Sequence, residues 1–130
     1  MPCRYVISPE HGVVISTAWD RVTFAEVDAH QDKLVQDPDF NPNFKQFVDA
    51  TAVTDIDISM DEARAILDRK IFSDTSRCAF LGRGLGVLGM GRLIEAKAAL
   101  QGGPEKVRVF SNRENALKWL GLESLPQQLL

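Results

Sequence analysis

The stretch richest in side chains that could do chemistry is residues 53–62, V-T-D-I-D-I-S-M-D-E. Oxygen-bearing side chains occupy alternate positions there, at Asp55, Asp57, Ser59 and Asp61. These match the first ligand positions of a calcium loop. Such a loop also needs a glycine where this chain has Met60, and a bidentate glutamate where it has Ile66. The calcium interpretation therefore fails, and we predict no metal site.

The same stretch allows two structural or catalytic interpretations. Paired carboxylates can act as general acid and base, but no histidine or nucleophile accompanies them in the sequence. Ser59, followed three residues later by Glu62, matches the capping box that begins a helix. Asp57 and Asp61 suit the positive end of a helix dipole. Capping is therefore favoured over catalysis, and we expect that the chain is not an enzyme.

A second motif is the glycine-rich segment 82–91, G-R-G-L-G-V-L-G-M-G. It contains G-x-G-x-x-G at Gly84, Gly86 and Gly89, after a predicted strand and before a predicted helix, as in dinucleotide-binding sites. The motif comes late in the chain, however, and the next strand ends at Phe110 without an acid to hold a ribose. Nucleotide binding by this loop therefore stays an alternative, and no cofactor is predicted.

The same segment mixes its glycines with cationic and apolar residues. Arg83 and Arg92 could meet an anion. The apolar members are Leu85, Val87, Leu88 and Met90. Because apolar residues are unusual in a solvated loop, we expect them to pack on the core or on a partner chain. The covering of a pocket is the alternative.

Short patterns predict the elements that position these motifs. Residues 4–8 and 13–19 are β-branched and aromatic and flank a turn with proline and glycine, which predicts an antiparallel hairpin. Capping boxes beginning at Thr23, Ser59 and Ser111 predict three helix starts. The first helix runs over residues 24–36 and ends before a proline. A further helix is predicted over about residues 90–101, with strands at 46–49, 78–81 and 106–110.

Alternation of strands and helices predicts the fold class. We expect a single α/β domain over residues 1–130, with a mostly parallel mixed sheet of about five strands, an opening antiparallel hairpin and about four helices. Ligands of such sheets bind beyond the carboxyl ends of the parallel strands. That rule gathers four segments on one rim, at residues 20–21, 49–59, 82–91 and 111–112.

Composition limits the classes of partner that the chain can bind. The 130 residues are 45% hydrophobic and carry a net charge of −3, which argues against a nucleic-acid ligand because binding to phosphates needs a basic face. No apolar run reaches the roughly 18 residues of a membrane span, so a cytoplasmic location is expected. Cys3 and Cys78 match no metal spacing. His30 lies on a predicted helical face between Val27 and Leu34, where a structural role is favoured.

Several segments resemble one known family. A strand ending in Phe47-Val48-Asp49, then A-T-A-V-T-D-I-D, then a capped helix resembles the core of STAS domains. The SpoIIAA-like branch, named for a bacterial anti-sigma-factor antagonist, is the most similar. The resemblance extends to D-P-D-F-N-P-N-F before the central strand and to the closing V-F-S-N-R-E-N-A-L-K-W-L. It implies a bacterial regulatory module without catalysis.

The resemblance also implies a phosphorylation site, from which this chain departs. The antagonists carry a phosphorylatable serine after an aspartate, within D-S-x-G. The matching aspartate is Asp57, but Ile58 stands at the serine position and Ser59 comes one residue late. A phosphate on Ser59 would also meet repulsion from Asp57 and Asp61. A cap is the favoured role for Ser59, with phosphorylation as the alternative.

This branch is also similar to the lipid-binding CRAL-TRIO domains, which implies an apolar ligand beneath the helices, with the glycine loop and Met90 as a gate. We therefore predict a regulatory module that binds a protein, a second copy of itself or a small ligand, lipids included. A phospho-regulated anti-sigma-factor antagonist and a nucleotide binder are the alternatives. The predicted binding residues are Asp49, Thr51, Asp57, Ser59, Arg83, Gly84, Gly86, Met90 and Arg92.

Overall fold

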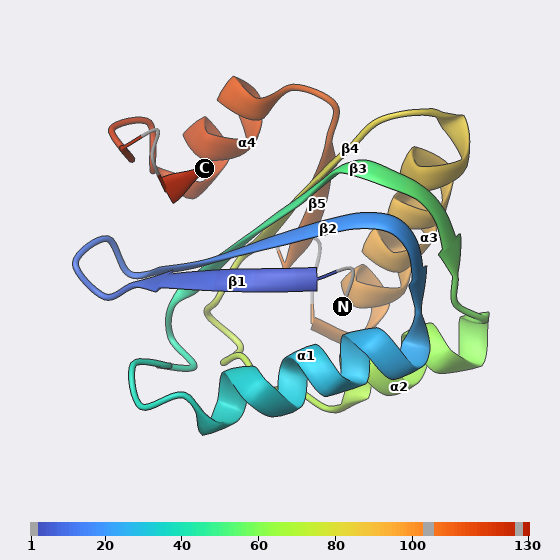
Figure 1. Cartoon of the computed structure of the whole chain (residues 1–130), viewed down its shortest axis with the longest axis horizontal. Helices are drawn as coiled ribbons and strands as arrows, with labels where there is room; N and C mark the ends of the chain where they lie inside the picture. The colour runs from blue at the N-terminus through green and yellow to red at the C-terminus, as the bar shows by residue number, and fades with distance from the viewer. Residues whose placement is uncertain (1–2, 103–105, 127–128) are drawn as a thin grey trace.

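The structure is a computed structural model that describes residues 3–102, 106–126 and 129–130. The described strands are β1 (Cys3–Ser8), β2 (Val13–Thr23), β3 (Lys45–Asp57), β4 (Cys78–Gly82) and β5 (Val107–Phe110). The described helices are α1 (Phe24–Gln36), α2 (Met60–Asp68), α3 (Leu85–Gly102) and α4 (Arg113–Leu120). They follow one another as β1, β2, α1, β3, α2, β4, α3, β5, α4 (Figure 1).

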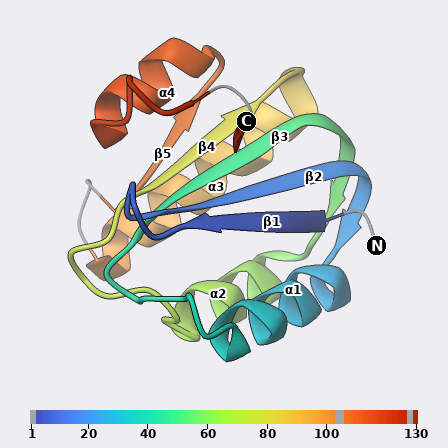
Figure 2. The same cartoon turned by 60° about the vertical axis from the view of Figure 1, so that its left-hand side comes forward.

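The strands form one mixed sheet in the order β1-β2-β3-β4-β5. β1 is antiparallel to β2, and each later strand is parallel to its predecessor. This confirms the predicted fold class: an opening hairpin, a mostly parallel sheet and, over the described residues, four helices. Strands that advance one place at a time through right-handed crossovers put every connecting helix on the same face. α1, α2 and α3 accordingly lie apart from α4, which follows the last strand (Figures 1 and 2).

Alternate residues of each strand face one or the other helix layer. Val13 and Ile15 of β2, Phe47 of β3 and Ala79 and Leu81 of β4 form a fully buried core with α4. That core also contains Ala116, Leu117 and Leu120 of α4 and Leu122 and Leu125 beyond it. The intervening residues point toward α1, α2 and α3, so the two faces of one sheet carry different packing.

β2 and β3 extend beyond the other strands and bend. Their pairing shifts between Thr17 and Trp19 and again between Asp20 and Arg21, each time with one extra residue in β3. Such bulges bend a pair of strands. We call residues 18–23 and 51–57 the bent extension; it buries Val22, Val53 and the following Ile58 with Ala63 of α2. The prediction that residues 49–59 form a loop is therefore wrong, because β3 continues to Asp57.

The glycine-rich segment is also not a loop. α3 begins at Leu85, so Gly86, Gly89 and Gly91 belong to the helix, and only Arg83 and Gly84 connect it to β4. Gly84 has a φ of +85°, which glycine adopts without strain. A Cβ on Gly91 would lie 3.1 Å from the ring of Phe80, so glycine there lets α3 approach the sheet closely.

The helix starts follow the predicted capping chemistry in part. Ser59 Oγ accepts from the Glu62 N–H at 3.1 Å and Glu62 Oε1 accepts from the Ser59 N–H at 2.9 Å, as predicted. Glu26 likewise accepts from the Thr23 N–H at 3.1 Å. The cap predicted at Ser111 is wrong. Asn112 is the N-cap of α4, and its Oδ1 accepts from the Asn115 N–H at 3.0 Å.

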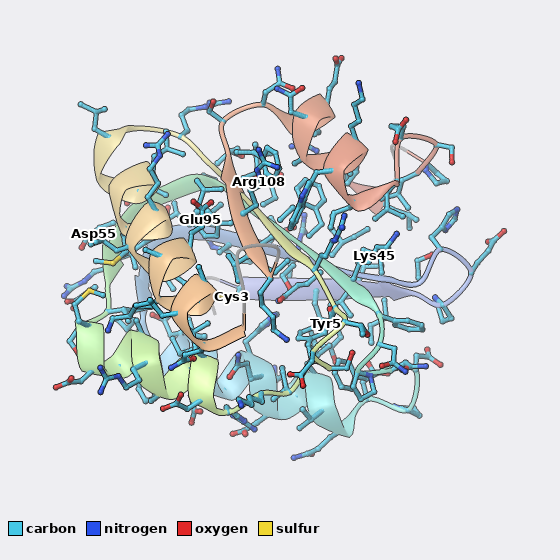
Figure 3. All side chains as sticks on the ribbon, turned by 180° about the vertical axis from the view of Figure 1, so that it is seen from behind. Cys3, Tyr5, Lys45, Asp55, Glu95 and Arg108 are labelled. Atoms are coloured by element: carbon cyan, nitrogen blue, oxygen red, sulfur yellow. The ribbon has the colours of Figure 1, made fainter. Side chains whose placement is uncertain are left out.

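β5 is an edge strand, and α3 covers its open side. Glu95 of α3 accepts a hydrogen bond from the Val109 N–H at 2.6 Å (its side chain is labelled in Figure 3). An unpaired edge N–H is otherwise a template for another strand. Glu95 therefore satisfies and shields this edge.

We expect Glu95→Ala to lower the free energy of unfolding by about 1–3 kcal/mol, because a charged acceptor is lost and the edge N–H is left unpaired. Glu95→Gln keeps an acceptor oxygen and should lose less. Urea denaturation measures both variants. Equal losses would mean that the Glu95–Val109 hydrogen bond does not stabilise the edge.

Candidate functional site

A cavity of about 280 Å³ lies between the sheet and the layer of α1, α2 and α3. Figure 3 shows this side of the molecule, with α3 in front of the sheet, α2 below it and the cavity residue Cys3 labelled. The volume is nearly twice that of a cavity of about 150 Å³ that holds benzene. It therefore has room for an apolar molecule on the order of ten non-hydrogen atoms.

Small residues on both walls leave this space open. Ala18 and Ala50 line it from the sheet, and Gly91 and Ala98 line it from α3. Between them the strand register places Ser16, Val48 and Phe80 in one row across β2, β3 and β4. Val48 and Phe80 stay partly exposed at the centre of the sheet, whereas Phe47 and Ala79, their neighbours on the other face, are fully buried.

Aliphatic and aromatic side chains make up most of the wall. The bent extension supplies one part of the wall, and the sheet and the helices supply the rest. The larger apolar lining residues are Val22, Val27, Leu34, Val48, Val53, Ile56, Ile58, Ile66, Leu67, Ile71, Phe72, Phe80, Ile94 and Val107. A wall of this kind favours an apolar ligand, because polar molecules would give up hydrogen bonds to water on entry.

α1 places two polar side chains in this apolar wall. His30 is buried, and its Nε2 lies 3.1 Å from Ser16 Oγ of β2. The Tyr5 ring packs edge-on against the imidazole, with ring centroids 5.4 Å apart. Burial, with a smaller contribution from Lys33, lowers the pKa of His30 below its usual value of 6.5. The imidazole is therefore neutral near pH 7, and this polar pair carries no charge.

Gln31 is the second polar group of α1. Its Oε1 is buried and accepts no hydrogen bond, and it is the single such side-chain atom within the described residues. Gln31 lines the cavity beside His30. In the sequence both residues stand between Val27 and Leu34 on an apolar helical stripe, a break in pattern that is the available signal for this site.

Charged groups lie where the cavity reaches the surface. Lys70, Asp74 and Lys106 line it near the start of β4 and β5. Lys106 Nζ donates to the Ser73 carbonyl at 2.8 Å and lies 3.9 Å from Asp74 Oδ1. This opening is at the opposite end of the parallel strands from the predicted rim.

The two cysteines line the cavity as uncharged thiols. Burial raises the pKa of Cys78 to about 12 and also raises that of Cys3. Cys78 is nonetheless partly exposed, because its accessible surface faces the cavity rather than bulk water. Thiols with raised pKa values are poor nucleophiles. Cys3 and Cys78 therefore act here as small apolar side chains.

Two classes of site find no support within residues 3–102, 106–126 and 129–130. No three histidine, cysteine, aspartate or glutamate side chains come together as a metal site. No helix is both long and apolar enough to cross a bilayer.

No protein-family model and no curated protein matches the sequence. Among solved structures, the chain is similar to an uncharacterized DUF3478-family protein with a SpoIIAA-like fold from Shewanella loihica PV-4. The sequences are 18% identical, and the superposition covers 91% of each chain with a TM-score of 0.54. The chain has a SpoIIAA-like fold.

The SpoIIAA-like fold brings part of the predicted rim together. Ala50 pairs with Gly82 and Leu81 pairs with Phe110, so Thr51, Arg83 and Ser111 follow at the same end of neighbouring strands. Ser59 is carried away from them, because β3 continues past Thr51 for on the order of 20 Å. The rim is therefore split between the sheet edge and the end of the bent extension.

Asp49 and Thr51 form part of an internal hydrogen-bond cluster. Asp49 Oδ1 accepts from the Thr51 N–H at 3.0 Å and from its hydroxyl at 2.7 Å. Asp49 Oδ2 accepts from Arg113 Nη2 at 2.7 Å. The cluster ties the start of α4 to β3. Sequence reasoning missed Arg113, which stands 64 residues away and carries no local signal.

The other predicted binding residues lie outside the cavity. Asp57 pairs with Arg21 on the exposed side of the bent extension, and Ser59 caps α2. Arg83, Gly84, Gly86 and Arg92 are exposed around the start of α3, and Met90 is half-buried. None of the predicted binding residues lines the cavity. Ile58, which the sequence resemblance aligned with the antagonists' serine, is buried and lines the cavity.

Buried His30 should make stability depend on pH. Because its pKa is lowered on folding, the unfolded chain binds the proton more readily. Stability is then fully present above about pH 6.5 and falls as the pH drops toward the lowered folded pKa, by at most about 1.4 kcal/mol per pH unit. We expect the unfolding free energy of the wild type to fall more steeply between pH 7.5 and 5.5 than that of His30→Gln. Parallel curves would exclude a contribution from His30.

Proposed function

We propose that this chain is a non-catalytic module of STAS type that binds one small apolar molecule in the cavity between the sheet and α1–α3. The observation that supports it is the contrast between the two faces of one sheet. The α4 face is filled by Phe47, Ala79 and Leu120. The opposite face retains about 280 Å³ of apolar space.

An empty apolar cavity lowers stability, by roughly 24 cal/mol for each Å³ in a measured series of core truncations. A ligand that fills the space recovers contacts that the free chain lacks. The wall offers mainly aliphatic and aromatic groups, and its inner polar groups, His30, Ser16 and Gln31, are uncharged. An uncharged, mostly apolar ligand therefore suits this cavity best.

The alternatives receive less support from the geometry. Ser59 Oγ already accepts a hydrogen bond from the Glu62 N–H as the cap of α2. Phosphorylation of Ser59 would break this hydrogen bond, and the phosphate would be repelled by Asp57 and Asp61. The G-x-G-x-x-G segment belongs to α3 after Gly84, which leaves a connection of two residues rather than a loop around a pyrophosphate.

Regulation by ligand binding is the function that we favour. A cytoplasmic location and a bacterial origin stay predictions.

A protein partner is the second candidate, and one feature favours it. The outer side of α3 exposes Leu85, Leu93 and Leu100, with exposed fractions of 92%, 51% and 89%. Exposed apolar side chains along one helix are common at protein interfaces. Native mass spectrometry of the purified chain would show both self-association and any retained small molecule.

Replacing one alanine by leucine on each face of the sheet tests the proposal. Ala98→Leu places a larger side chain in the cavity and should keep or raise the melting temperature while abolishing the binding of naphthalene. Ala116→Leu adds the same atoms to the filled α4 face and should lower the free energy of unfolding by about 1–3 kcal/mol. Calorimetric titration and urea denaturation measure the two effects. Unimpaired naphthalene binding by Ala98→Leu, or no binding by the wild type, would refute the proposal.

A further inference from the structure

We propose that Gln31 selects the ligand: the cavity takes an uncharged apolar molecule that carries one hydroxyl or N–H donor, which binds Gln31 Oε1. This inference rests on the proposed function and names the ligand class. Two observations lie behind it: Gln31 Oε1 is buried and accepts no hydrogen bond within the described residues, and other atoms of the Gln31 side chain line the cavity. Rotation about the last, soft torsion of the side chain turns the oxygen toward a ligand. A buried acceptor without a donor is costly, and the cost is removed when a ligand brings the donor.

The neighbouring groups do not supply that donor. Ser16 Oγ and His30 Nε2 are engaged with each other at 3.1 Å. Arg69 approaches the same helix, but its guanidinium binds Asp28 and Asp32. Nothing in the described part of the chain therefore satisfies Gln31 Oε1 from within.

The charges around the cavity argue against an ionised head group at this position. The nearby imidazole of His30 is held neutral by burial. The lysines of the lining, Lys70 and Lys106, lie near the start of β4 and β5, and Lys106 Nζ already donates to the Ser73 carbonyl. A carboxylate beside Gln31 would be buried without a cation and would face a carbonyl oxygen. An alcohol, a phenol or a secondary amide meets neither penalty.

The test compares ligands of one shape that differ in a single polar group. Naphthalene has no donor, 1-naphthol has one hydroxyl, 1-methoxynaphthalene accepts but does not donate, and 1-naphthoate is anionic. Calorimetric titration of the wild-type chain at pH 7 should give the lowest Kd for 1-naphthol, about tenfold below that of naphthalene. 1-Methoxynaphthalene should bind no better than naphthalene, and 1-naphthoate should bind worst.

Substitution of Gln31 should remove this preference. In Gln31→Leu the ratio of the naphthalene Kd to the 1-naphthol Kd should fall about tenfold, and the ligand-free melting temperature should rise because the unpaired oxygen is gone. Gln31→Met, which keeps the length of the side chain, should behave alike and serves if Gln31→Leu does not fold. Gln36→Leu changes an exposed glutamine at the end of the same helix and should leave the ratio unchanged.

The outcomes separate this inference from the proposed function. If the wild type binds none of the four compounds, the proposed function and this inference both fail. If the wild type binds them but the ratio is unchanged in Gln31→Leu and Gln31→Met, the cavity binds ligands and the role of Gln31 is refuted. Tightest binding of 1-methoxynaphthalene would mean that an amide N–H of Gln31 faces the ligand, and would overturn the assignment of a donor.

Discussion

The handedness of the strand connections is the constraint on which this structure depends. β2, β3, β4 and β5 are parallel and advance one place at a time across the sheet. Each right-handed crossover must then put its helix on the same face. The opposite face receives only α4 and the residues that follow it. An asymmetric molecule, with a deep layer on one side and a thin one on the other, follows from that rule.

The asymmetry explains why the space opens on the crossover side. Three helices of different lengths must cover one twisted sheet, and each is tied to the strand ends that it connects. Gly91 brings α3 close to Phe80 at one point, where a Cβ on Gly91 would lie 3.1 Å from the phenyl ring. Ala98 farther along α3 and Ala18 and Ala50 at the other end of the sheet also line the space, and none of these small side chains fills it. On the other side α4 lies over Phe47 and Leu81, where large and small residues fill the layer.

The parts of the fold that local patterns determine could be predicted from the sequence. Alternating β-branched residues identified the hairpin, and the Ser59–Glu62 pair identified the start of α2. The carboxyl end of β3 and the start of α3 were predicted wrongly. Asp55 and Asp57 resemble part of a loop in the sequence, yet they pair with Arg21 and Thr23 of β2 and belong to β3. The glycines of α3 resemble a turn in the sequence, yet they belong to a helix, and Gly91 lets that helix pack closely on Phe80.

The candidate site was beyond sequence reasoning for a different reason. A cavity is the difference between the space that the backbone encloses and the volume of the side chains that enter it, and neither quantity is local. The pairing of Asp49 with Arg113 across 64 residues is equally nonlocal. The polar residues on the apolar stripe of α1 were visible, but His30 and Gln31 can be told apart only by their partners. Ser16 engages His30, whereas Gln31 Oε1 has no donor among the residues that the structure describes.

Polar groups at the rim and in the interior therefore differ in whether the chain itself supplies their hydrogen-bond partners. Asp49 and Thr51 satisfy each other and Arg113, Asp57 pairs with Arg21, and Ser59 exchanges bonds with Glu62. A ligand at these groups would have to displace bonds that the chain already makes. The interior keeps an acceptor without a donor and a volume without side chains. Since binding is favoured where a ligand supplies what the protein lacks, the crossover side of the sheet is the candidate site that we favour. Ile58 is consistent with this contrast, because it is buried and lies in the wall of the cavity.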